Sequence, residues 1–142
     1  MSETTFLRSS MLYAGAQYAA AARVPTGEHL IFTAGACPLN PDGSTAAIGD
    51  YQGQTAKVMD NLLLALAAGG ADFSHLVKTT VFVASSDRED LAGVWNVVRA
   101  RMGDRDVPST LLGVTVLGYP DQLVEVEAIA ALPVPDPPAP AS

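Results

Sequence analysis

Two glutamates on one face of a predicted strand are the residues best suited to chemistry in this chain. Residues 123–130 alternate with a period of two, which places Glu125 and Glu127 together on one face. A solvated strand face is the simple interpretation, because Asp and Glu side chains are seldom buried. A carboxylate held at a boundary between subunits could instead act as a general acid or base. Both interpretations remain open at this point.

Six segments of the chain are candidates for the strands around these glutamates. Most are short runs of apolar and β-branched residues that end in turn-forming residues. The least regular is 14–22, an alanine-rich stretch whose spacing fits a helix as well as a strand or loop. The candidates are residues 2–10, 14–22, 30–35, 76–84, 111–117 and 123–130.

Two helices are predicted between these strands. Asp50 can cap a helix over about 51–68 that ends at two glycines, and Ser86 with Glu89 forms a capping-box pattern that opens a second helix. Both helices can lie on one face of a single mixed sheet. The predicted fold class is α/β (α+β): one two-layer domain with a mixed six-stranded sheet. Its other face carries apolar residues, and formation of an oligomer would cover them.

Composition limits the classes of function. The 142 residues carry a net charge of −7 and their basic residues are scattered, so no nucleic-acid partner is expected. The only cysteine, Cys37, excludes a disulfide within the chain and favours a reducing compartment. Without a signal peptide or a long apolar run, we expect a cytoplasmic protein with no membrane partner. No metal or cofactor is expected, because no zinc-type spacing or phosphate-binding loop occurs.

Three motifs, taken in their order and spacing, point to one family. The first is Pro108 followed by an apolar strand, a turn and the run Val-Glu-Val-Glu-Ala-Ile-Ala at 124–130. The second is Lys-Thr-Thr-Val-Phe-Val at 78–83, and the third is an apolar strand that ends in Ala34-Gly35. Together they resemble the Rid (YjgF/YER057c/UK114) family, which contains small trimeric enamine/imine deaminases. We therefore expect a Rid-like domain over 1–131.

The resemblance implies a chorismate-mutase-like fold, a homotrimer whose sheets form a barrel, and a small-molecule pocket between subunits. Glu125 matches the family glutamate that positions or activates a water, and it is the predicted catalytic residue. Tyr18 matches a tyrosine at the pocket edge, and the backbone of Gly35 is open to close approach by a ligand. Asn96 matches a helix asparagine near the pocket, with Trp95 as the alternative for that place.

Thr110 is the main departure from the family pattern. Family members usually carry an arginine here that holds the substrate carboxylate, and the spacing to Glu125 matches without a gap. Threonine offers one neutral hydroxyl in place of a charged fork, and Leu112 makes the same wall more apolar. We therefore expect an Arg-lacking subgroup in which Thr110 and Leu112 contact a small, largely uncharged substrate.

The predicted function is hydrolysis or deamination of an imine or enamine, or a related glutamate-assisted proton transfer. The typical activity on 2-aminoacrylate or 2-iminopropionate is expected to be weak or absent. The alternatives are a non-catalytic trimer that binds a small ligand or a partner protein, and a specialised enzyme of a secondary-metabolite pathway. Residues 132–142 are rich in proline, which predicts a disordered tail.

Overall fold

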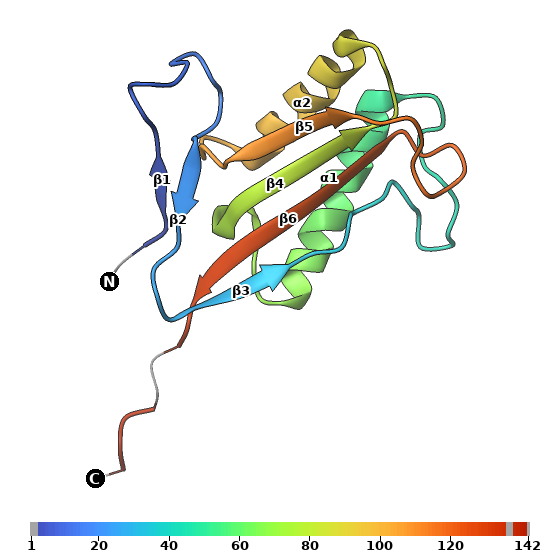
Figure 1. The fold of residues 1–142 in the computed structure, drawn as a ribbon. Coiled ribbons are helices and arrows are strands. Elements are labelled where there is room, and N and C mark those ends of the chain that lie inside the picture. The colour runs from blue at the N-terminus through green and yellow to red at the C-terminus, as the bar shows by residue number, and fades with distance from the viewer. Residues whose placement is uncertain (1–2, 136–137, 142) are drawn as a thin grey trace.

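The computed structural model describes residues 3–135 and 138–141. Its centre is a mixed four-stranded sheet in the order β3-β6-β4-β5 (Figure 1). The last strand, β6, is antiparallel to both of its neighbours, whereas β4 and β5 are parallel. The strands are β3 (Glu28–Phe32), β4 (Leu76–Val83), β5 (Ser109–Gly113) and β6 (Val124–Pro133).

Both helices cover the same face of this sheet, as predicted (Figure 1). Helix α1 spans Tyr51–Ala68 and is capped by Asp50, whose side chain accepts a hydrogen bond from the Gly53 backbone N–H at 3.0 Å. Helix α2 spans Arg88–Met102. Its cap is Asp87 rather than the predicted Ser86, because the Asp87 carboxylate accepts the N–H of Glu89 at 2.9 Å.

The core lies between the helices and the sheet. Every second residue of β4 and β6 points into it, and three residues one helical turn apart in α1 meet them. Full burial of such side chains contributes roughly 1.5–3 kcal/mol each. The fully buried members include Met59, Leu62, Leu66, Val81, Val83, Val94, Val98, Val124 and Val126.

The predicted six-stranded sheet needs one correction. Strands β1 (Thr5–Leu7) and β2 (Ala21–Arg23) pair with each other in a separate two-stranded sheet, beside the main one (Figure 1). Pro25, which has no backbone N–H to donate, lies in the connection between β2 and β3, and β3 pairs with β6 instead. The helical alternative for 14–22 is wrong, because β2 takes its end and the rest is irregular.

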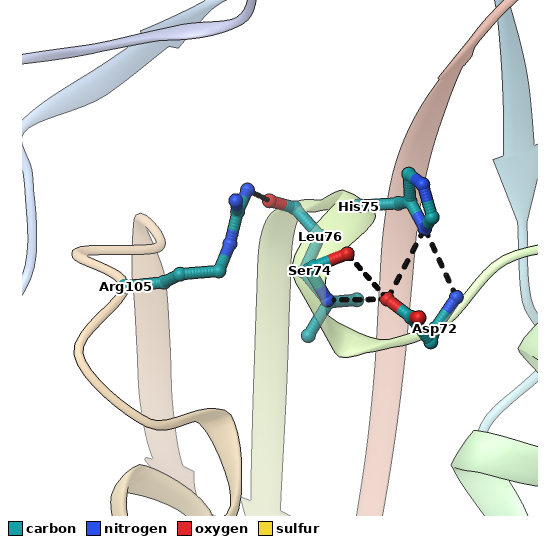
Figure 2. A network of polar contacts seen from close by, with 5 residues as sticks. All are labelled: Asp72, Ser74, His75, Leu76 and Arg105. Atoms are coloured by element: carbon teal, nitrogen blue, oxygen red, sulfur yellow. Dashed lines mark hydrogen bonds and ion pairs between the residues drawn. The ribbon is translucent and has the colours of Figure 1, made fainter.

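A polar network fixes the start of β4 (Figure 2). Asp72 caps a short 3₁₀ helix, η1 (Phe73–His75), and the hydrogen bonds from Ser74 lower the pKa of its carboxyl. The Asp72 N–H donates to Nδ1 of His75 at 3.1 Å, and this nitrogen lies 3.2 Å from Oδ1 of the Asp72 carboxylate. Arg105 donates to the Leu76 carbonyl at 2.8 Å. The network therefore stabilises η1 and the start of β4.

The end of β6 lies two residues beyond the predicted domain boundary. Leu132 pairs with His29 and Pro133 with Glu28, so β3 holds the first residues of the predicted tail. Residues 136–137 and 142 of that tail lie outside the described residues. In the part of the chain that the structure describes, no helix is both long and apolar enough to cross a membrane.

Candidate functional site

The sheet face opposite the helices is uncovered, and it carries the predicted site. Figure 1 shows no helix in front of it. Three of its apolar side chains are strongly exposed: Phe32 (68%), Leu30 (48%) and Leu112 (40%). Such a patch on one chain is typical of an interaction or ligand surface. The face also includes Lys78, Thr80, Phe82, Thr110, Glu125, Glu127 and Ile129.

Strand register sets which of these side chains are neighbours. Glu125 is opposite Phe82, and Phe82 is opposite Leu112. Two strand spacings therefore separate Glu125 from Leu112, roughly 10 Å between Cα atoms. The next row in the same direction contains Thr110 and Glu127, on either side of Thr80. The structure thus brings three predicted residues, Glu125, Thr110 and Leu112, to one face.

One oxygen of the Glu125 carboxylate is held from two sides. The thiol of Cys37 donates to Oε1 at 3.1 Å and the amide Nε2 of Gln122 donates to it at 3.3 Å. Among the described residues, no hydrogen bond reaches Oε2. A Cβ added at Gly35 would lie 2.6 Å from Oε2, so only glycine leaves room for the carboxylate there. Oε2 is therefore the carboxylate oxygen that has no hydrogen-bond donor among the described residues.

Helix α1 positions the two loops that supply these donors. Asn61 donates through Nδ2 to the carbonyls of Cys37 at 2.8 Å and Leu39 at 2.9 Å. The fully buried Gln54 donates to the Asp121 carbonyl at 2.8 Å and accepts the Leu123 N–H at 2.7 Å. Buried amides that satisfy loop backbone in this way hold the loop in one position. The geometry at Glu125 therefore depends on residues far from it in sequence.

Cys37 is a hydrogen-bond donor and not an activated nucleophile. Burial raises the pKa of its thiol to about 11, and the neighbouring Glu125 adds to the increase through its hydrogen bond and charge. The thiol therefore stays protonated at neutral pH, which preserves its bond to Oε1. Since the thiolate is the reactive form of cysteine, slow alkylation at neutral pH follows.

The Cys37–Glu125 contact leads to a prediction about how the alkylation rate of Cys37 depends on pH. In Glu125→Gln the carboxylate charge is lost, so we expect the pKa of Cys37 to fall from about 11 and to stay above 9.0, because burial remains. The rate of iodoacetamide alkylation against pH measures it, and the single cysteine makes the signal unambiguous. Glu89→Gln, in the exposed first turn of α2, is the control. An identical profile in Glu125→Gln and the wild type would show that the two side chains do not interact.

Tyr18 lies in a different part of the same face. It lines a hollow of about 450 Å³ together with Lys78, Thr110 and Ile129. Ile129 is four residues along β6 from Glu125, about 13 Å at strand spacing, so one chain does not bring Tyr18 and Glu125 together.

The structure separates the two candidates on α2. Trp95 meets the Tyr18 ring edge to face, with 6.2 Å between centroids, and donates through Nε1 to Gln17 at 2.9 Å. Asn96 is the next residue of α2 and is exposed, and its side chain leaves the helix in a different direction from that of Trp95. Trp95 and not Asn96 therefore contacts the predicted pocket-edge tyrosine.

Lys78 is the residue of this face that sequence reasoning missed. Its Nζ donates to Oγ1 of Thr110 at 2.7 Å. The period-two pattern of β4 already placed Lys78 opposite the core side chains, and that signal could have identified it. Nearby arginines are engaged elsewhere: Arg99 donates to the Gln17 carbonyl, and Arg101 pairs with Asp60. Within the described residues, no cluster of three His, Cys, Asp or Glu side chains could hold a metal.

Comparisons with known proteins find relatives of this chain. A sequence model of the family described as endoribonuclease L-PSP matches residues 9–132. The chain is 38% identical to protein DfrA of Myxococcus xanthus over 80% of this chain and 83% of the relative. It is 32% identical to a RutC family protein of Pyrococcus abyssi over 72% and 78% of the two chains.

Solved structures share the fold. The Rid family protein YyfB of Yersinia pestis superposes with a TM-score of 0.84, 23% identity and coverage of 92% of this chain and 100% of that one. The YjgF gene product of Escherichia coli gives a TM-score of 0.62 at 31% identity, over 83% and 89% of the two chains.

Proposed function

Because this chain belongs to the Rid (YjgF) family, whose sequence model is described as endoribonuclease L-PSP, we propose that it hydrolyses a C=N bond in a small molecule. The observation that carries the proposal is the Glu125 carboxylate, held by Oε1 with Oε2 free on an uncovered sheet face. Family membership supports a deaminase-like or endoribonuclease-like role in general. The acidic character of this chain favours the first, since RNA phosphates would meet Glu125 and Glu127.

The proposed reaction begins with Oε2 of Glu125 as general base. It accepts a proton from a water whose oxygen attacks the imine carbon, the C=N electron pair moves to nitrogen, and Glu125 returns this proton to the nitrogen. The hydroxyl proton of the resulting carbinolamine then passes through Glu125 to the same nitrogen, and ammonia leaves as the C=O bond forms, so that one imine and one water give one carbonyl compound and one ammonia. The hydrogen bonds from Cys37 and Gln122 orient the carboxylate for this step.

The proposed substrate is uncharged and partly apolar. Thr110 offers no positive charge, and its hydroxyl already accepts a hydrogen bond from Lys78. Phe32 and Leu112 present exposed apolar surface on the same face. These features support the proposal that the chain represents an Arg-lacking subgroup of the family. A substrate carboxylate would also meet repulsion from Glu125.

A homotrimer is part of this proposal. The exposed apolar face needs cover, and Tyr18 and Glu125 of one chain lie too far apart to share a ligand. A pocket between subunits, to which one subunit contributes Glu125, Gly35 and Leu112 and its neighbour contributes Tyr18, resolves both points. We place the trimer in the cytoplasm, in keeping with a single unpaired cysteine.

Substrate charge provides the test. Imines generated by an amino-acid oxidase from amino-acid amides or esters should decay faster with the protein than without it. The decay of imines that carry a free carboxylate should be accelerated at least about tenfold less. Thr110 cannot supply the charge-assisted hydrogen bond of an arginine, which is worth about 1.5–3 kcal/mol. Stopped-flow decay of the imine measures both, and oxidase with buffer alone is the control. Equal acceleration of carboxylate substrates would overturn the assignment of Thr110.

The second candidate is a trimer that binds a small ligand or a partner without catalysis. The same uncovered apolar face favours it, because binding needs surface and shape but no acid or base. The variant Glu125→Gln separates the two candidates, since only a catalyst depends on a proton acceptor at this position.

A further inference from the structure

Lys78 lies beside two hollows on the sheet face. It is one of only two lysines, and the other, Lys57, lies in α1. Lys78 lines the hollow of about 450 Å³ that contains Tyr18, and also an adjoining hollow of about 170 Å³ that reaches Glu127. Its amine therefore stands between two spaces large enough for small molecules.

The surroundings of this amine are mostly apolar. Leu30, Phe32 and Ile129 line the larger hollow around it, and Thr110 accepts its hydrogen bond at 2.7 Å. The charged group that faces it is the Glu127 carboxylate of β6. Burial lowers the pKa of Lys78, and the charge of Glu127 acts in the opposite direction. A half-buried amine in an apolar site is the kind of lysine that reacts as a nucleophile.

We propose that Lys78 captures small aldehydes or ketones with an apolar substituent as an imine in this hollow. The lone pair of Nζ attacks the carbonyl carbon, a C–N bond forms, and a proton passes from nitrogen to the carbonyl oxygen. The carbinolamine then loses its hydroxyl and the remaining N–H proton as one water, and the C=N bond forms. One amine and one carbonyl compound thus give one imine and one water.

The class of ligand follows from the lining. An apolar substituent fits against Leu30, Phe32 and Ile129, whereas a carboxylate would be repelled by Glu127. The hydroxyl of Thr110 lies beside Nζ, where it can hydrogen-bond the carbinolamine oxygen. The inference goes beyond the proposed function, in which water and Glu125 act and no bond forms to the protein. It needs neither Glu125 nor an imine substrate.

Reductive trapping tests the inference. The full chain is incubated at neutral pH with propanal and cyanoborohydride, which reduces an imine to a stable secondary amine, and peptide mass spectrometry locates the adduct. We expect labelling of Lys78 at least about fivefold faster than of Lys57, because a held carbonyl reacts at a raised effective concentration. Labelling of Lys78 should also saturate with propanal concentration, whereas that of Lys57 should rise linearly.

Two variants make the result decisive. Lys78→Arg retains the positive charge without a primary amine and should lose the fast, saturable adduct, and Lys57→Arg should keep it. Equal labelling of both lysines, or a linear dependence at Lys78, would overturn the inference. Imine hydrolysis without trapping would refute the Lys78 site alone, and trapping without imine hydrolysis would refute the proposed function alone.

Discussion

Glu125→Gln is expected to reduce the rate of imine hydrolysis by a factor on the order of 10²–10⁴, the usual contribution of a general acid or base. Glutamine has nearly the same shape as glutamate, so the contact of Gln122 with Oε1 can persist while the proton acceptor is lost. The change therefore isolates the chemistry from the packing. Stopped-flow decay of a neutral imine measures the rate, and circular dichroism and thermal unfolding check that the fold is retained.

Two further glutamates give this experiment its controls. Glu89→Gln removes one negative charge in the exposed first turn of α2 and should leave the rate within about twofold, since isolated surface changes have small effects. Glu127→Gln changes the other glutamate of the same strand face. A large loss in Glu127→Gln with normal turnover in Glu125→Gln would assign the base to Glu127. Turnover that is unchanged in all three variants would show that neither Glu125 nor Glu127 is the base, whereas no turnover in the wild type would favour the binding-only candidate.

Local pattern was enough to predict the main architecture. The period of two in β6 placed Glu125 opposite the core residue Val124, and the helical spacing of α1 and α2 put both helices on the sheet. The resemblance to the Rid family is confirmed by the family match and the structural neighbours. These features depend on residues close together in sequence, where side-chain direction is determined by the backbone period.

The features that the sequence did not reveal depend on contacts between distant segments. Whether β2 joins the main sheet depends on which strand lies beside it, and that strand is β1. The Cys37 donor to Glu125 is equally hidden, because Cys37 is 88 residues away in sequence. Trp95 and Asn96 are adjacent on α2, and only the helix orientation against Tyr18 separates them. Tertiary packing supplies this information, and a single sequence does not contain it in readable form.

Gln54→Leu is expected to have the largest effect on stability among changes outside the apolar core. The Gln54 side chain is fully buried and bonds both the Asp121 carbonyl and the Leu123 N–H. Leucine has a similar volume but removes both hydrogen bonds, each worth about 0.5–1.5 kcal/mol. The free energy of unfolding should therefore fall by about 1–3 kcal/mol, a large share of the 5–15 kcal/mol typical of a domain.

Urea unfolding at one fixed protein concentration measures this change, because the stability of an oligomer depends on concentration. Gln52→Leu is the matched control: it lies in the same helix, is exposed, and should change stability by no more than about 0.5 kcal/mol. Gln54 also holds the loop that carries Gln122, so Gln54→Leu should slow imine hydrolysis even where the protein remains folded. Loss of stability with undiminished turnover would mean that Gln122 does not orient Glu125, whereas loss of both would show that α1 supports the fold and the site through one amide.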